Sequence, residues 1–366
     1  MRIAILGAGG FIGSHLVEHL LARNEHEVVG LDLTAEKLRG ITGRAFTFVR
    51  ADLCSGSRQV EEVIQRADVV VNLVAYANPS IYVTSPLEVF ELNFMQNLDV
   101  ARFCVRHRKR LVQYSSAEVY GKAVAGDSFS EETTDLVVGP IHRQRWIYAS
   151  AKILLERVLY AHGVAGDLDY TIVRPFNFVG PRMDYLVPAH AVGGPRVFPH
   201  FMSALLTGGP IRLVDGGWVH RAFTHIRDAN SAFQTLLDRP EDTRNQIYNL
   251  GNPMNNTTIR DLAVLMMEIY EGLTGRAADS EVVDIDGEVF YGVGYEDGDR
   301  LPPDISKMQA LGWDPCCDLR QTITDSMAYY VADRRMAAWG AQRDSRALVR
   351  SLRSHGGPAS SVDFPC

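Results

Sequence analysis

The chain has 366 residues, which corresponds to about two domains and excludes a mini-protein held together by disulfides. Hydrophobic residues make up 46% and charged residues 22%, and 37 basic against 44 acidic side chains give a net charge of −7, so nucleic acid is not expected as a partner. The five cysteines lack metal-ligand spacing, so we expect no metal site and a reducing, cytoplasmic location. No apolar stretch approaches the roughly 18 residues of a membrane span, so we expect no membrane anchor.

The first half of the chain alternates short apolar, β-branched runs with amphipathic stretches, which is typical of βαβ units. Strands are expected at Arg2–Leu6, Glu27–Leu31, Ala45–Arg50, Val69–Leu73, Arg110–Ser115 and Tyr170–Arg174. Helices are expected at Phe11–Ala22, Ser57–Arg66, Leu87–Arg106 and Trp146–His162. Because the strands are apolar nearly throughout, helices should cover both faces of the sheet. The predicted fold class is α/β, a Rossmann-type doubly wound parallel sheet.

Glycine- and proline-rich connections with shorter elements follow after about Pro175. We therefore expect a sheet domain over residues 1–175, to which some later segments return, and a smaller C-terminal α/β substrate lobe over 176–334. Residues 335–366 contain scattered arginines and a Gly-Gly-Pro segment, which indicates a weakly ordered tail.

The segment Gly7-Ala-Gly-Gly10-Phe-Ile-Gly13 follows the first strand and opens the first helix. Gly7 and Gly10 would let the backbone approach a pyrophosphate at the helix N-terminus, and Gly13 would let helix and strand pack closely. Asp32 ends the second strand, where a carboxylate accepts hydrogen bonds from ribose hydroxyls and favours NAD over NADP. The residues expected at the cofactor are Gly7, Gly10, Phe11, Ile12, Gly13, Asp32, Asp52, Leu73, Tyr148 and Lys152, with Asp52 nearly as easily explained as a helix cap.

Tyr148 and Lys152 lie four residues apart and therefore on one face of a predicted helix. A nearby ammonium group favours the phenolate, so the pair suggests a tyrosine whose pKa is lowered for work as a general base. Ser116 and Glu118 follow the fifth predicted strand, at the sheet edge where such folds bind ligands.

These motifs, together with Arg174-Pro-Phe-Asn177-Phe-Val-Gly-Pro181, resemble the extended short-chain dehydrogenase/reductase family from residue 1 to about residue 334. The resemblance implies that Tyr148 takes a proton from the sugar 4-hydroxyl while NAD takes the C4 hydride. It further implies that Ser116 and Lys152 assist Tyr148, and that the helices Leu87–Arg106 and Trp146–His162 pair two copies into a homodimer.

Finer motifs around Arg145-Trp-Ile-Tyr148, Arg221–Asp228 and Phe290–Tyr295 are similar to UDP-glucuronic acid decarboxylases, above all the decarboxylase domain of the aminoarabinose pathway and then the UDP-apiose/UDP-xylose synthases. By this resemblance Glu118 and Arg300 lie at the sugar C5 and its carboxylate. The residues expected at the nucleotide sugar are Asn177, Arg182, Arg196, Arg212, Arg221, Tyr295 and Arg300. A ketone at C4 makes the C5 carboxylate a β-keto acid that loses CO2, and a bidentate arginine suits that carboxylate.

One position departs from the decarboxylase pattern, because Ala117 stands where those enzymes carry a serine before the glutamate. Alanine cannot transfer a proton, so water or Glu118 would have to protonate C5, and the sequence does not decide between release and reduction of the 4-keto product. The alternatives are a C4-epimerase or another C5-directed enzyme acting on a different nucleotide sugar, and more remotely a non-catalytic NAD-binding protein. The arginines Arg196, Arg212 and Arg221 could also be solvated surface charges.

Overall fold

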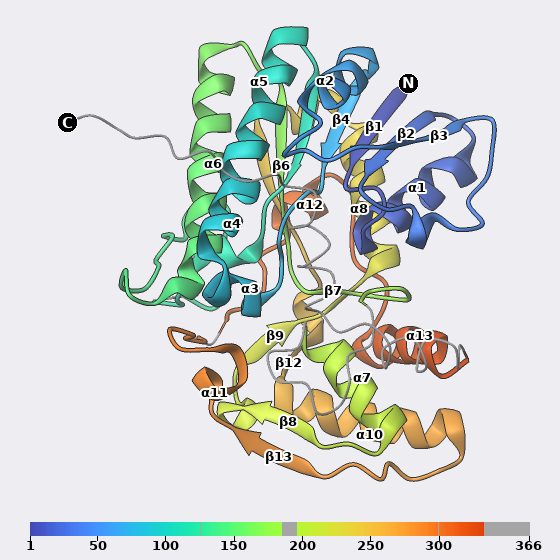
Figure 1. The fold of residues 1–366 in the computed structure, drawn as a ribbon, viewed down its shortest axis with the longest axis vertical. Helices are drawn as coiled ribbons and strands as arrows, with labels where there is room; N and C mark the ends of the chain where they lie inside the picture. The colour runs from blue at the N-terminus through green and yellow to red at the C-terminus, as the bar shows by residue number, and fades with distance from the viewer. Residues whose placement is uncertain (125, 185–195, 299, 333–366) are drawn as a thin grey trace, which may run out of the picture.

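The computed structural model describes residues 1–124, 126–184, 196–298 and 300–332, so the tail expected over 335–366 lies outside the described part (Figure 1). A sheet domain occupies the upper part of the view in Figure 1 and a smaller lobe the lower part. Within the described residues, no helix has both the length and the apolar character needed to cross a membrane.

A parallel sheet of seven strands, in the order β11-β6-β5-β4-β1-β2-β3, forms the centre of the upper domain. Its strands are β1 Arg2–Leu6, β2 Glu27–Asp32, β3 Phe46–Arg50, β4 Val69–Asn72, β5 Arg110–Tyr114, β6 Tyr170–Pro175 and β11 Gln246–Leu250. The chain runs from β1 outward to β3 and then returns to β4 on the other side of β1, which creates a crevice at the carboxyl ends of these two strands. The predicted Rossmann-type sheet is thus confirmed, and β11 joins it from the second half of the chain.

Alternate residues of β1 pack into two different cores. Ile3 and Ile5 belong to the core shared with α1 (Phe11–Arg23) and α8 (Ile226–Asp238). Ala4 and Leu6 belong to the core on the opposite face, which helices α2, α5 and α6 complete. These helices span Ser57–Arg66, Asn97–His107 and Ile147–Ala165. The two-residue side-chain period of a strand buried on both faces explains why β1 is apolar from Ile3 to Leu6.

The helix expected over Leu87–Arg106 is divided into α4 (Pro86–Phe90), a π-helical turn (Glu91–Gln96) and α5. The side-chain amide of Asn97 donates to the carbonyl of Leu92, 2.7 Å away, and so takes an acceptor that the helical backbone would otherwise use. Asn93 bonds to both backbone groups of Tyr76, at 2.8 and 3.0 Å. Buried asparagines thus anchor the segment after β4 at the expense of regular helix geometry.

The lower lobe is built from short strand pairs with helices packed against them (Figure 1). Strand β8 (Ile211–Val214) pairs with β13 (Val282–Ile285), β9 (His220–Ala222) with β12 (Asn256–Thr258), and β7 (Phe178–Val179) with β10 (Thr224–His225). Its helices are α7 Val197–Thr207, α10 Ile259–Thr274, α11 Gly287–Tyr291 and α13 Leu319–Ala332. The short helices α3 Pro79–Thr84, α9 Pro240–Thr243 and α12 Ser306–Ala310 complete the described set.

Candidate active site

The loop between β1 and α1 has no room for side chains at its glycines. A Cβ atom at Gly9 would lie 1.9 Å from the carbonyl oxygen of Thr34, and one at Gly13 would lie 2.2 Å from that of Gly7. Gly7 has a φ of +88°, which only glycine adopts without strain. This bare backbone at the start of α1 fits the pyrophosphate of a dinucleotide, so the residues present are suited to NAD. Gly9 was missed in the sequence, although it is the second glycine of the Gly-x-Gly-Gly run over residues 7–10, which could have indicated it.

Asp32 lies directly beside this loop. Its Oδ2 accepts a hydrogen bond of 2.9 Å from the backbone N–H of Gly9, and its Oδ1 accepts one of 3.2 Å from Thr34. Burial raises the pKa of Asp32, while these backbone donors oppose that rise. Asp52 instead accepts from the N–H of Cys54 (3.0 Å) and the hydroxyl of Ser55 (3.1 Å), so here the structure shows a turn cap.

A cavity of about 270 Å³ lies between the carboxyl ends of the strands and the lower lobe. Of the expected site residues, those lining it are Ile12, Leu73, Ser116, Glu118, Tyr148, Lys152, Asn177, Arg196, Arg212, Arg221, Tyr295 and Arg300. Phe11, Asp52 and Arg182 are not among the described lining residues. Phe11 packs edge-on against His15, and Arg182 pairs with Glu18 on α1.

The three residues expected to act on the C4 hydroxyl meet in this cavity. Tyr148 lies in the first turn of α6, and Ser116 caps the short 3-10 helix that follows β5. Burial raises the pKa of Tyr148 to about 12, and a hydrogen bond with Ser116 opposes this rise. Lys152 donates to the carbonyl of Tyr114 at 3.0 Å, and burial lowers its own pKa to about 8.

The expectation that Lys152 lowers the pKa of Tyr148 is therefore not met, because burial raises this pKa and Lys152 is not among the groups that oppose the rise. Removal of the phenol from water outweighs any nearby charge, and the phenol ring also stacks on Tyr82 at a centroid distance of 4.6 Å. Tyr82 comes from α3 and was not singled out in the sequence, because nothing in its local pattern connects it to residue 148.

Glu118 forms ion pairs with two arginines, Arg145 and Arg300. Its Oε2 lies 2.7 Å from Arg145 and 2.6 Å from Arg300. Burial alone would raise the pKa of Glu118, but the two guanidinium groups outweigh burial and lower it to about 2. Glu118 is thus ionised at neutral pH.

A second carboxylate completes this charge cluster. Asp297 lies 2.5 Å from Arg221 and 4.0 Å from Arg145, and these arginines outweigh the effect of burial and lower its pKa to about 2. We call Glu118, Arg145, Arg221, Asp297 and Arg300 the charge cluster. The sequence analysis did not predict Arg145 and Asp297 as site residues. No local pattern connects the two, because they lie far apart in the sequence.

The remaining expected substrate residues surround the same space. Arg196 pairs with Asp184 at 2.6 Å, and Tyr295 stacks on Tyr291 at a centroid distance of 4.3 Å. Asn177 has a φ of +36° and donates to the carbonyl of Ala222 at 3.1 Å. The arginines of the lobe that line the cavity are therefore largely built into ion pairs and are not simple surface charges.

Comparison with known proteins agrees with this geometry. The sequence pattern described as the NAD dependent epimerase/dehydratase family matches residues 3–251. A UDP-D-apiose/UDP-D-xylose synthase of Oryza sativa subsp. japonica is 38% identical over 356 residues, covering 90% of this chain and 89% of its own. The crystal structure of the PbgP3 protein from Burkholderia pseudomallei, 33% identical, superposes with a TM-score of 0.83 over 94% of this chain and 99% of its own. The UDP-glucose 4-epimerase of Thermus thermophilus, solved with NAD, is 26% identical, with a TM-score of 0.74 over 91% and 100%.

Proposed function

Because this chain belongs to the NAD dependent epimerase/dehydratase family and is an NAD-dependent enzyme of the extended short-chain dehydrogenase/reductase type, we propose that it oxidises UDP-glucuronic acid at C4 and removes its carboxyl group. The observation that carries this proposal is the position of Arg300 and Arg145 next to Ser116 and Tyr148 in one cavity. A substrate carboxylate near the oxidised carbon requires such cations, whereas a neutral sugar does not.

Each residue of the cavity has a task in this scheme. NAD, when bound, accepts the hydride of C4 and brings positive charge into the cavity. Tyr148 would take the proton of the 4-hydroxyl, which Ser116 holds by a hydrogen bond. For this step the phenol must first lose its own proton, and the positive charges of Lys152 and bound NAD would favour that loss against the effect of burial. Lys152, with a pKa of about 8 lowered by burial, can bind ribose hydroxyls and pass a proton at neutral pH.

Glu118, Arg145 and Arg300 of the charge cluster then serve the carboxyl end of the sugar. Arg300 and Arg145 orient the carboxylate by hydrogen bonds from their planar donors. Glu118 keeps these arginines in place and adds negative charge, which makes a second carboxylate less stable in its neighbourhood and favours its loss as CO2. The electrons left at C5 pass to the ketone at C4. Water is the proton donor to C5 in this scheme, because Ala117 has no hydroxyl and Glu118 is ionised.

The lobe would hold the diphosphate and uridine of the substrate. Arg196, Arg212 and Arg221 line the part of the cavity that the lobe contributes, and guanidinium groups match phosphate oxygens. We accordingly assign NAD to the sheet domain and the nucleotide sugar to the lobe.

The same features also fit a second reaction, C4-epimerisation. A C4-epimerase acting on an acidic nucleotide sugar also needs Tyr148, Ser116 and a carboxylate-binding arginine, and it needs no proton donor at C5. Ala117 is the specific observation in favour of this second candidate.

Mass spectrometry of the purified protein incubated with NAD and UDP-glucuronic acid separates the two reactions. Decarboxylation predicts a product lighter by CO2, with NADH accumulating if the 4-keto sugar is released. An unchanged mass at a shifted retention time would indicate epimerisation. A protein that binds NAD and turns over no nucleotide sugar would contradict both.

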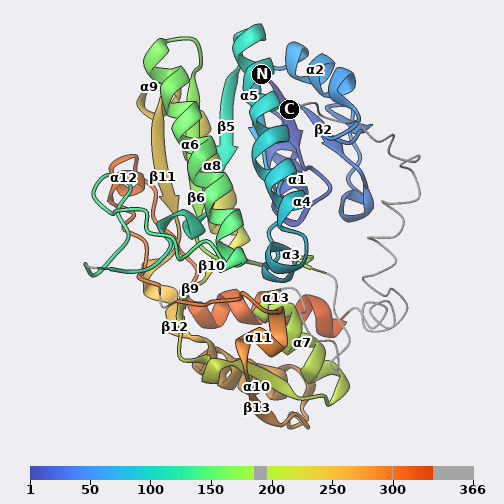
Figure 2. The same ribbon diagram turned by 60° about the vertical axis from the view of Figure 1, so that its left-hand side comes forward.

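We also propose a homodimer formed through α4, the π-helical turn, α5 and α6, which lie side by side on one face (Figure 2). Leu87 is 80% exposed and Leu154 is 45% exposed on these helices, an apolar surface that a second copy would cover. Analytical ultracentrifugation should show a dimer for the wild type and a monomer for Leu87→Glu/Leu154→Glu. A monomeric wild type at micromolar concentration would contradict the proposal.

A cytoplasmic location is likewise part of the proposal. Cys54, Cys104, Cys316 and Cys317, the cysteines within the described residues, are all free thiols, as a reducing compartment keeps them.

A further inference from the structure

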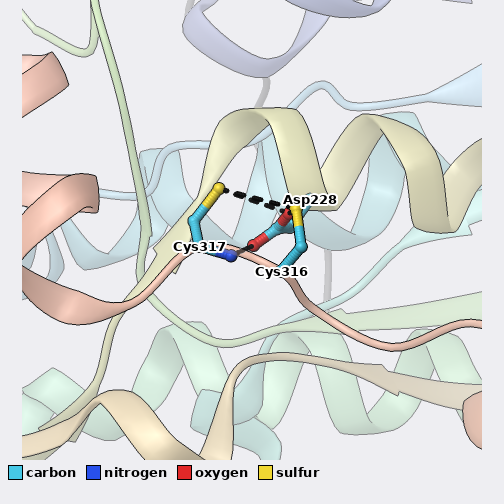
Figure 3. Close-up of side chains that lie close together, drawn as sticks. All are labelled: Asp228, Cys316 and Cys317. Carbon is cyan, nitrogen blue, oxygen red and sulfur yellow. Dashed lines mark hydrogen bonds between the residues drawn. The ribbon is translucent and has the colours of Figure 1, made fainter.

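Two adjacent cysteines and an aspartate meet away from the catalytic cavity (Figure 3). Asp228 lies in the first turn of α8, and Cys316 and Cys317 lie in the loop before α13. The Oδ1 atom of Asp228 is 3.1 Å from Sγ of Cys316 and 3.5 Å from Sγ of Cys317, and the two sulfurs are 3.9 Å apart. None of the three is among the described residues that line the catalytic cavity.

These distances match the edges of a tetrahedral metal site. Zinc binds cysteine sulfur at about 2.3 Å and carboxylate oxygen at about 2.0 Å, so two sulfur ligands lie about 3.8 Å apart and a sulfur and an oxygen about 3.5 Å apart. We propose that the two sulfurs and Oδ1 of Asp228 form a site for one thiophilic divalent cation of the Zn²⁺ class. Cys316 is exposed, so ions can enter from solvent and water can fill the fourth position.

The surroundings hold the three ligand atoms in place. Oδ2 of Asp228 accepts a hydrogen bond of 3.0 Å from the backbone N–H of Cys317, which turns Oδ1 toward the sulfurs. The guanidinium of Arg227 donates to Sγ of Cys317 at 3.0 Å. Two thiolates and a carboxylate around a dication carry one net negative charge, which Arg227 and the N-terminus of α8 offset.

Ion binding at this site must release protons. A cysteine thiol ordinarily has a pKa of about 8.5, so free cysteines such as Cys316 and Cys317 carry their protons at neutral pH. Binding forms two metal–sulfur bonds and one metal–oxygen bond, and the two S–H protons pass to solvent. No oxidant takes part. A disulfide between the two is disfavoured, because neighbouring Cα atoms are only about 3.8 Å apart, closer than disulfides prefer.

The site lies where the sheet domain meets the lobe. Asn230 of α8 donates to the carbonyl of His15 on α1 at 3.2 Å. On the other side, Asn252 and Asn255 donate to the carbonyl of Cys317 at 2.9 and 3.0 Å. A bound ion would join α8 to the loop before α13, and it would stabilise the folded protein by ligand linkage without touching the substrate. Cysteine spacing did not reveal the site, because Asp228 lies 88 residues before Cys316.

Titration of the reduced full-length protein with Cd²⁺ alone tests the proposal. We expect one ion per chain, seen by sulfur-to-cadmium charge-transfer absorption in the ultraviolet, with two protons released, and loss of that absorption when Zn²⁺ displaces Cd²⁺. The Cys316→Ser/Cys317→Ser variant should bind at least 100-fold more weakly, and Asp228→Asn roughly tenfold more weakly. The matched control Cys54→Ser/Cys366→Ser removes two other thiols and should bind like the wild type.

Two results would overturn the proposal. One is the absence of saturable Cd²⁺ uptake by the wild type at micromolar concentration. The other is equal affinity in the variant that lacks the cysteine pair, which would place the ion elsewhere. If that double variant does not fold by circular dichroism, Cys316→Ala, which alters an exposed side chain, takes its place with the same expected loss.

Discussion

The active site has a cofactor end and a sugar end, which are built in opposite ways. The charge cluster of the sugar end lines the cavity, whereas Gly7, Gly9 and Gly13 of the cofactor end are not among its described lining residues. The cofactor end comes from one short loop, and it works because residues 7, 9 and 13 have no side chains. The sugar end comes from segments spread between residues 118 and 300, and it works because two carboxylates hold three arginines in ion pairs. The first end should therefore fail when an atom is added, and the second when a charge is removed.

The largest effect is expected where the two ends meet. Tyr148→Phe removes the proton acceptor and keeps the ring that stacks on Tyr82, so kcat should fall roughly 1000-fold with little change in fold or NAD affinity. Steady-state kinetics together with NAD titration check this. Activity within tenfold of the wild type would remove Tyr148 from the mechanism.

Gly9→Ala should weaken NAD binding and leave the charge cluster unchanged. The added Cβ would meet the Thr34 carbonyl at 1.9 Å, so the loop must shift, and the Kd for NAD should rise roughly 100-fold, about 2.8 kcal/mol. Gly43→Ala is the matched control, because no atom lies within 4 Å of its added Cβ. Isothermal titration with NAD measures both, and equal Kd values in the two variants would contradict the steric account.

Glu118→Gln should break the sugar end alone. It keeps the shape of the side chain and removes the charge that pairs with Arg145 and Arg300, so turnover should fall roughly 30-fold while the Kd for NAD stays unchanged. Glu296→Gln serves as control, since Glu296 pairs with Lys122 and is not one of the described lining residues. A parallel loss in both variants would argue against a specific role for Glu118.

Acid should lower the free energy of unfolding through one histidine near each end of the active site. Burial lowers the pKa of His15 on α1 and of His200 on α7 from 6.5 to about 4. Between these values the unfolded chain binds protons that the folded protein does not, so stability is present above pH 6.5 and lost as the pH falls toward 4. From pH 7.5 to pH 5 each histidine should remove roughly 2 kcal/mol.

Urea unfolding at several pH values tests this expectation. His15→Gln and His200→Gln should each flatten the dependence by a similar amount. A slope that neither substitution changes would show that other groups control acid unfolding.

The smallest effect is expected for Asp52. Its carboxylate caps a turn through Cys54 and Ser55, so Asp52→Asn, which keeps the accepting oxygen, should change the Kd for NAD by less than about twofold. A tenfold change would restore the expectation that Asp52 contacts the cofactor.

The difference between the two ends also explains what the sequence could predict. The sheet and the glycine loop depend on local patterns: β1 and α2 begin and end at the predicted residues, and Gly7, Gly10 and Gly13 lie in one run. The charge cluster depends on pairs such as Arg145 with Asp297, whose separation of about 150 residues leaves no local signal. The π-helical turn escaped prediction because Asn93 and Asn97 also bond to the backbone of Tyr76 and Val74, which lie outside the helix. The pKa of Tyr148 was misjudged because desolvation cannot be read from an i, i+4 pair.

The central claim is that the charge cluster directs C4 oxidation toward loss of the C5 carboxylate. UDP-glucuronic acid labelled with ¹³C in that carboxylate, supplied to the wild type with NAD, tests it most directly. We expect ¹³CO2 in a one-to-one ratio with the sugar consumed, and none with Tyr148→Phe. Full conversion to a nucleotide sugar of unchanged mass but different retention time, with the label retained, would contradict the claim and identify the enzyme as a C4-epimerase.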